Sequence, residues 1–229
     1  MPIVVALGVV LLIALVFGPQ WWVRHVLKSH GSERLDLPGT GGEFARHLLD
    51  EADLNQVTVE VTDRGDHYDP DARAVRLLPQ HFEGRSIAAV AVAAHEVSHA
   101  VQHARGERPF ERRLALVGKL IWVDRIASGL LLLAPIVFIF VKAPILLAVQ
   151  LAAGIALLAV HVVVHAVTLP VEFDASFGKA LPAIERGRYL APADLPRARQ
   201  VLRAAAWTYV AAALATLLNV GRWFRMIRF

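Results

Sequence analysis

The chain opens with a long stretch that lacks charged side chains. Residues 1–23 are rich in Val, Leu, Ile and Ala, end with Trp21 and Trp22, and are followed by Arg24. An apolar run of about 20 residues with aromatic and basic side chains at its end is typical of a membrane-spanning helix. A cleaved signal peptide is the alternative, but it requires positive charge before the apolar run and a small-x-small cleavage site after it. Neither is present, so the pattern favours a membrane anchor over 1–23.

Three further apolar runs lie in the second half of the chain, at 126–141, 143–171 and 204–221. Lys142 separates the first two, and their lengths predict a hairpin of two membrane helices. The third run is rich in Ala. It is compatible with a membrane span and equally with a buried or interfacial helix.

The polar segment that follows the anchor contains patterns of short elements. Phe44, Leu48 and Leu49 have helical spacing and indicate a first helix. Apolar and polar residues alternate over 57–61, and a similar segment covers 73–78. These two segments predict short strands that pair with each other.

The composition extends this picture to the whole chain. Of the 229 residues, 56% are hydrophobic and 19% are charged, and the mean hydropathy is +0.49. This is more apolar surface than a soluble domain of this length can bury, so the composition indicates an integral membrane protein. The formal net charge is +4, but the basic residues are dispersed among acidic ones. We therefore do not expect nucleic acid as a partner.

The distribution of Lys and Arg predicts the orientation of the spans. Basic side chains, among them Arg112 and Arg113, gather beside the span ends that border the two polar segments, whereas the hairpin loop offers only Lys142. By the positive-inside rule, both polar segments lie in the cytoplasm. The basic C-terminal tail conflicts with a fourth crossing. The prediction is a multi-pass protein of the cell membrane whose site faces the cytoplasm.

The candidate chemistry lies on a helix near the end of the first polar segment. Ser86 can cap this helix and Gly106 can stop it. Within it, the sequence HEVSH places His95 and His99 four residues apart, so both imidazoles project from one face toward one metal ion. Glu96 can take a proton from a metal-bound water, whose pKa zinc lowers. Because the chain has no Cys, any metal must be held by His, Asp or Glu.

A catalytic zinc also requires a third protein ligand. Glu172 is the strongest candidate, because it follows Pro170 at the exit of the hairpin, where a new helix can begin. A hairpin returns the chain to the side from which it left, so Glu172 comes back to the side of the His95 helix. Ala175, one turn further, is small enough to let the two helices approach closely.

Four separated segments make the sequence similar to a known family. They are 66–70 (DHYDP), 95–102 (HEVSHAVQ), 168–176 (TLPVEFDAS) and 208–212 (TYVAA). In this order they resemble the YugP-like family of bacterial membrane zinc metallopeptidases. The segment that begins at Glu172 also resembles the E-x-x-A-D segment of membrane proteases related to HtpX and the prenyl proteases. In those proteases the Glu is the third zinc ligand, and the resemblance implies this role for Glu172.

Several positions depart from the patterns of these proteases, and Phe177 and Gly178 replace a more basic pair. Ser98 stands where the family usually has Gly. Ser176 stands where the related proteases have an Asp behind a ligand His, so the carboxylate that would orient an imidazole is missing there. Asp174 is the candidate to replace this carboxylate, but its position on the helix is unfavourable for reaching the imidazole.

Other side chains allow two interpretations each. Tyr209 can donate a hydrogen bond to the oxyanion of a tetrahedral intermediate, or it can be a Tyr at a membrane surface. His161 and His165 lie four residues apart in an apolar run, where an ionisable group indicates function, but no acid accompanies them. His103, one turn beyond the HEVSH motif, is expected to be a structural residue or to support a ligand.

Together these features predict a mainly α integral membrane protein with a gluzincin-like zinc site and a small strand pair beside the HExxH helix. The expected parts are a membrane anchor (1–23), a cytoplasmic segment with the HExxH helix (24–113), a membrane hairpin (114–171), a segment with the third zinc ligand (172–203) and a C-terminal membrane or interfacial helix (204–229).

The expected function is zinc-dependent cleavage of peptides or membrane-protein segments. His95, His99 and Glu172 hold Zn²⁺, and Glu96 is the general base. An extended substrate can pair with a free edge of the strand over 73–78, or this segment can be an ordinary hairpin strand that only covers the helix. The alternatives are a membrane metal transporter or a metal-binding scaffold without turnover. The sequence leaves the oligomeric state open.

Overall fold

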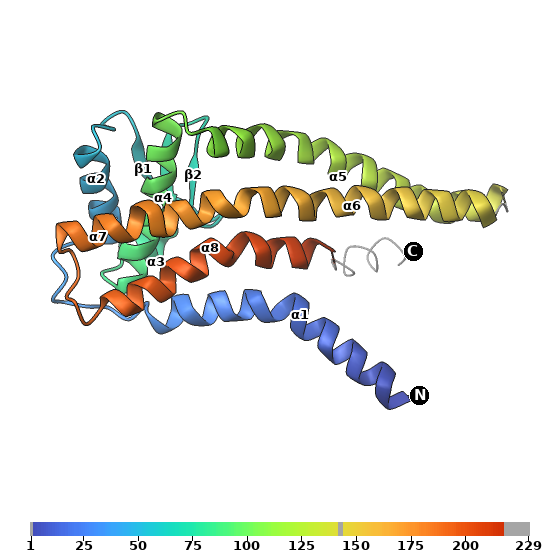
Figure 1. Cartoon of the computed structure of the whole chain (residues 1–229), viewed down its shortest axis with the longest axis horizontal. Coiled ribbons are helices and arrows are strands. Elements are labelled where there is room, and N and C mark those ends of the chain that lie inside the picture. Colours follow the sequence, from blue (N-terminus) through green and yellow to red (C-terminus); the bar gives the residue numbers. More distant parts are fainter. Residues whose placement is uncertain (1, 142–143, 218–229) are drawn as a thin grey trace.

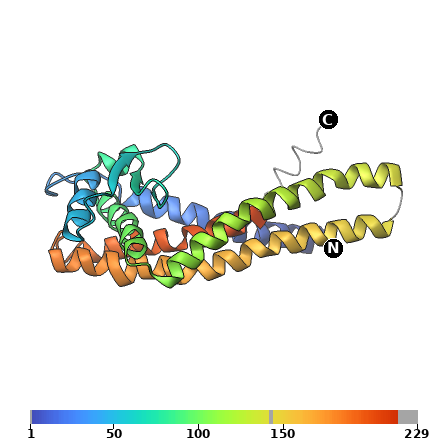
Figure 2. The same ribbon diagram turned by 90° about the horizontal axis from the view of Figure 1, so that it is seen from above.

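The computed structural model describes residues 2–141 and 144–217. In chain order the elements are α1 (Pro2–Ser29), α2 (Gly41–Glu51), β1 (Thr58–Val61), β2 (His67–Asp69), β3 (Ala74–Leu77), α3 (Pro79–Phe82), α4 (Ile87–Ala104), α5 (Arg108–Val141), α6 (Pro144–Phe173), the π-helix η1 (Asp174–Ala180), α7 (Leu181–Gly187) and α8 (Leu195–Leu217). Figure 1 shows the long helices α1, α5, α6 and α8 extending from one end of the molecule, where the shorter elements gather. In Figure 2, α5 and α6 lie side by side and project beyond the other elements.

The first short helix, α2, forms where the spacing of apolar residues predicts it. Thr40 and Glu43 make a capping box, in which Glu43 N donates to Thr40 Oγ1 (3.3 Å) and Thr40 N donates to Glu43 Oε2 (2.8 Å). Leu48 and Leu49 are buried. Their face packs against α4, so α2 covers one side of the helix that carries the HExxH motif.

The sheet contains the predicted pair of strands and one more. Its strand order is β1-β3-β2, with β1 parallel and β2 antiparallel to β3. The prediction that 57–61 and 73–78 pair is confirmed, but the expectation of a free edge on the second strand is wrong, because β3 has a neighbour on both sides. The strand β2 was not predicted. It follows Asp66, whose Oδ1 accepts a hydrogen bond from Leu78 N (2.8 Å) beside the end of β3.

The HExxH helix, α4, lies at the centre of the compact end. Ser86 caps it by accepting a hydrogen bond from Ala89 N (3.0 Å), and Gly106 follows it with a φ of +58°. These ends confirm the predicted helix. Nearly all of its residues are buried, because α2, α3, α8, η1 and the sheet contact it on different sides. Small Ala side chains allow this close approach.

The helix α6 ends later than the sequence predicts. It passes Pro170 and continues to Phe173, where the π-helix η1 follows without a break in the helical path. Glu172 therefore lies in the last turn of a long helix, and the expectation that a new helix begins there is wrong.

The integral membrane class is not supported. Within residues 2–141 and 144–217, no helix is both long enough and apolar enough to cross a membrane. Composition counts apolar side chains without placing them, and many of them lie in the core around α4. We therefore correct the class to a mainly helical protein with a small three-stranded sheet. Residues 218–221 of the last apolar run, and the basic tail, lie outside the described residues.

Candidate metal centre

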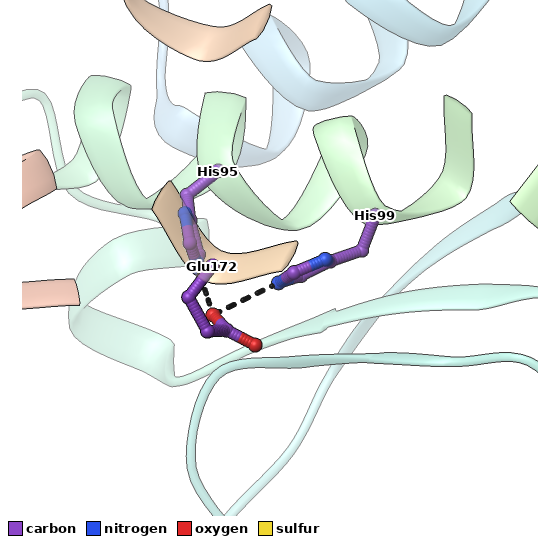
Figure 3. A group of neighbouring side chains, drawn as sticks. All are labelled: His95, His99 and Glu172. Carbon is purple, nitrogen blue, oxygen red and sulfur yellow. Dashed lines mark ion pairs between the residues drawn. The ribbon is translucent and has the colours of Figure 1, made fainter. Parts of the chain in front are cut away.

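Two imidazoles and one carboxylate meet between α4 and the end of α6. Figure 3 shows His95 and His99 pointing from α4 toward Glu172. The Oε2 atom of Glu172 lies 3.2 Å from Nε2 of His95 and 3.3 Å from Nε2 of His99. The candidate ligand atoms lie within 4.8 Å of one another. The side chain of His95 is 5% exposed, that of His99 is 4% exposed and that of Glu172 is 0% exposed. Water therefore does not screen this group from its protein neighbours.

Ser176 holds His95 from behind. Its Oγ lies 3.0 Å from Nδ1 of His95 and donates its proton to the backbone oxygen of Leu202 (3.0 Å). Because the hydroxyl proton is used on Leu202, Oγ accepts from His95 Nδ1–H, and Nε2 is left with a lone pair that faces Glu172. The hydroxyl thus takes the place of the Asp that the sequence comparison with related proteases led us to expect.

Gln102 holds His99 in a similar way. Its Nε2 donates to the backbone oxygen of Val171 (3.0 Å) and to Oδ2 of Asp174 (2.8 Å), which leaves Oε1 to accept from His99 Nδ1 (2.9 Å). Asp174 also forms an ion pair with Lys179. Asp174 therefore supports His99 through Gln102, and it does not contact His95 as a substitute for Ser176 would.

Arg113, on the second turn of α5, contacts the other oxygen of the same carboxylate. Its Nη1 lies 2.6 Å from Oε1 of Glu172, and its side chain is 12% exposed. One turn earlier, Phe110 is buried against the ring of His99, with centroids 6.0 Å apart. Sequence reasoning counted Arg113 only as a basic residue near a span end. No local spacing connects it to Glu172, since the contact depends on how α5 and α6 pair.

Electrostatic interactions shift the pKa values of the two buried glutamates in opposite directions. Burial alone would raise the pKa of Glu172, but His99, His95 and Arg113 outweigh it and hold that pKa well below its usual range. Burial raises the pKa of Glu96, and the two imidazoles only partly offset it. Burial acts to lower the pKa of His95, but the neighbouring carboxylates raise it overall. Glu172 is therefore anionic, as a metal ligand must be, whereas Glu96 is a stronger base than an exposed glutamate.

The segment 66–70 contributes one charge that acts on Glu96 and one contact with α4. Asp66, which binds Leu78 N, also accepts a hydrogen bond from Nδ1 of the buried His81 (2.8 Å). The negative charge of Asp66 contributes to the raised pKa of Glu96. Tyr68 from the same segment is bonded through its hydroxyl to Nδ1 of His103 (2.9 Å). The role expected for His103, structural or supporting a ligand, stays a prediction.

Three other candidate residues cannot be placed at the site by their side chains. Tyr209 lies on α8, and His161 and His165 lie on α6. Their side chains are outside the part of the chain that the structure describes. The proposed role of Tyr209 in catalysis stays a prediction, and so does the structural interpretation of the two histidines.

The donor set fits a zinc ion. Two imidazole nitrogens and one carboxylate oxygen are the ligands of open catalytic zinc sites. Neither oxygen of Glu172 has a hydrogen bond of regular geometry within the described residues, and its close contacts are ion pairs. A buried carboxylate in this state is suited to a cation. The fold and the site therefore define a metal centre of the kind found in zinc metallopeptidases.

Comparison with known proteins agrees with this class. Residues 4–228 match the family described as "Putative neutral zinc metallopeptidase", and the chain belongs to this family. It is 37% identical over 214 residues to the "Putative membrane protease YugP" of Bacillus subtilis (strain 168), an alignment that covers 92% of this chain and 90% of that protein. No solved structure matches the chain significantly. The family confirms the resemblance seen in the sequence and makes zinc the metal of the centre.

Proposed function

We propose that the protein is a zinc-dependent endopeptidase. The observation that carries this proposal is the buried group of His95, His99 and Glu172. Glu96 is also buried and lies next to His95 on α4. A metal-binding scaffold needs the ligands alone. The additional buried carboxylate, with a pKa raised by burial, is the group that hydrolysis requires.

Each residue of the centre has a separate role in this proposal. His95, His99 and Glu172 hold the metal, which supplies an activated water and polarises the scissile carbonyl. Glu96 accepts a proton from the attacking water and later donates it to the leaving amine. Ser176 and Gln102 fix the two imidazoles with Nε2 inward, so both nitrogens keep their lone pairs for the metal. Tyr209 is proposed as an oxyanion donor.

The substrate class is proposed from chemistry and from the relative. Peptides or segments of membrane proteins are the expected substrates, and association with a lipid bilayer is supported by the description of the Bacillus relative as a membrane protease. The cytoplasmic position of the site stays a prediction. It rests on the distribution of Lys and Arg along the sequence alone.

The test is the variant Glu96→Gln, with Glu83→Gln as a matched control. Glu83 is exposed and lies at the end of α3, so its substitution makes the same charge change away from the centre. Glu96→Gln should retain zinc but lose at least about 100-fold in turnover of casein or a membrane-protein panel, because an amide cannot accept the proton. Glu83→Gln should behave like the parent protein, and a chelator should stop both active forms. Zinc content and hydrolysis are measured on the same preparation.

Two results would contradict the proposal. Unchanged hydrolysis in Glu96→Gln would reject the role of this carboxylate. Stable zinc binding without hydrolysis in the parent protein, across the whole substrate panel, would favour a metal-binding scaffold instead.

A further inference from the structure

The two oxygens of Glu172 have different neighbours. Oε2 faces the two imidazoles, and Oε1 faces the guanidinium of Arg113 at 2.6 Å. The side chain of Glu172 is fully buried, and that of Arg113 is nearly so. The contact joins α5 to α6 at the point where the metal ligands meet.

A carboxylate can bind a metal ion through one oxygen or through both. A positive charge in close contact with one oxygen of a carboxylate stabilises the negative charge there and competes with the metal for that oxygen. The guanidinium is planar and permanently charged, so its ion pair with Glu172 does not depend on the protonation of Arg113 at physiological pH. In this structure the guanidinium contacts Oε1, and the two imidazoles contact Oε2.

We propose that Arg113 is a positioning residue for the metal centre. Arg113 holds Oε1 of Glu172, so that only Oε2 is presented to the metal. Oε2 lies beside Nε2 of His95 and Nε2 of His99. The pairing of α5 with α6 is thereby part of the metal site, although the three candidate ligands lie on α4 and α6. This inference rests on the metal centre and is independent of whether the protein hydrolyses peptides.

The experiment compares Arg113→Gln and Arg113→Lys with Arg112→Gln. Arg112 is the exposed neighbour on the same turn of α5, so its substitution removes the same charge outside the site. Zinc affinity is measured by competition with a chromophoric chelator. The visible spectrum of each protein loaded with Co²⁺ in place of zinc reports the geometry of the ligands.

Arg113→Gln should weaken zinc binding by about 10–100-fold and change the Co²⁺ spectrum, because Glu172 can then rotate and offer both oxygens. Arg113→Lys should lie between this variant and the parent, since an ammonium keeps the charge but lacks the fixed planar donor group. Arg112→Gln should match the parent in both measurements. Melting of the chelated proteins separates a local effect from a loss of fold.

The inference is overturned if Arg113→Gln keeps the zinc affinity and the Co²⁺ spectrum of the parent. If Arg113→Gln does not fold, the same two measurements on Arg113→Lys decide, and parental values there overturn it. Parental zinc affinity with reduced peptide turnover would also overturn it, and would assign Arg113 to substrate. Failure of the peptidase proposal, seen with Glu96→Gln, leaves these zinc and Co²⁺ measurements unaffected.

Discussion

Each side chain that can bind the metal is held by a different kind of partner. His95 donates to the Ser176 hydroxyl, His99 donates to the Gln102 amide, and Glu172 is paired with a guanidinium. Neutral partners leave the imidazoles less basic than a direct carboxylate would. The anionic character of the centre is therefore concentrated on Glu172, whose pKa is held well below its usual range by His99, His95 and Arg113 against the effect of burial.

We expect Ser176→Ala to weaken zinc binding by about 10–100-fold, because His95 loses the acceptor that fixes its ring and its tautomer. Ser98→Ala is the matched control. Ser98 is also buried on α4, but its hydroxyl donates to the backbone of Ala94 (2.7 Å) within the helix and not to a ligand. Equal zinc affinities for Ser176→Ala and Ser98→Ala, measured by chelator competition, would show that the hydroxyl does not support the centre.

The sequence could predict which side chains meet at the candidate centre, but not the residues that hold them. The spacing of His95 and His99 follows from the period of one helix, and the resemblance to related proteases implied Glu172. Arg113 meets Glu172 only because α5 and α6 pair in one particular register. Gln102 meets His99 within α4, but its amide is oriented by Val171 and Asp174 from distant segments. Contacts of this kind have no periodic signature in a single sequence.

The π-helix η1 is the element that brings the supporting residues together. It begins two residues after Glu172, directly after Phe173, and carries Asp174 and Ser176. A π-helix has more residues per turn than an α-helix, so side chains in it are displaced from the positions that α-helical spacing gives. The unfavourable phase inferred for Asp174 from the sequence agrees with the structure, in which Asp174 bonds to Gln102 behind His99 and Ser176 bonds to His95.

Gly178 is required for the close packing inside η1. A Cβ atom at this position would lie 2.3 Å from Oδ1 of Asp174, so Gly178→Ala must displace the carboxylate that Gln102 and Lys179 bind. We expect a loss of about 1–3 kcal/mol in stability and a weaker hold on zinc. Gly118→Ala, on α5 with nothing within 4 Å of its Cβ position, should instead be neutral or stabilising by up to about 1 kcal/mol.

Melting and chelator competition on the two alanine variants check this prediction. If Gly178→Ala has the same Tm and zinc affinity as Gly118→Ala, the prediction is wrong. Asp174 can then move aside without cost, and η1 tolerates a side chain at position 178.

The sheet shows where element patterns were insufficient. Alternation identified β1 and β3, but β2 is only three residues long and lies in a segment rich in turn formers. Its position depends on Asp66 bonding to Leu78 N and on Tyr68 bonding to His103. These contacts place β2 on the edge of β3 that the sequence predicted to be free.

An ion-pair cluster at the compact end of the molecule joins distant parts of the chain. Arg34, just after α1, forms a two-pronged contact with Asp194, just before α8, at 3.2 and 2.9 Å. Arg197 also donates to Asp194 (2.7 Å). The side chain of Asp194 is 6% exposed. The cluster thus ties the end of α1 to the start of α8, which pack against each other and carry part of the core beside α4.

This cluster makes the stability of the whole molecule dependent on pH. The hydrogen bonds from Arg34, and then those from Arg197, outweigh burial and lower the pKa of Asp194. A carboxylate whose pKa is lowered by folding stabilises the protein above its unfolded pKa of about 3.9, and that contribution is lost as the pH falls through the folded value.

Asp194→Asn should therefore lower Tm at pH 7, by on the order of 2–4 °C or more for a chain of this length. The difference from the parent should shrink as the pH falls below about 4, because protonation removes the same charge from the parent. Asp63→Asn is the control, since Asp63 is exposed and lies outside the cluster. Melting curves of the three proteins from pH 7 to pH 3 decide the matter. A gap between parent and Asp194→Asn that stays constant over this range would mean that packing of the side chain, and not its charge, joins α1 to α8.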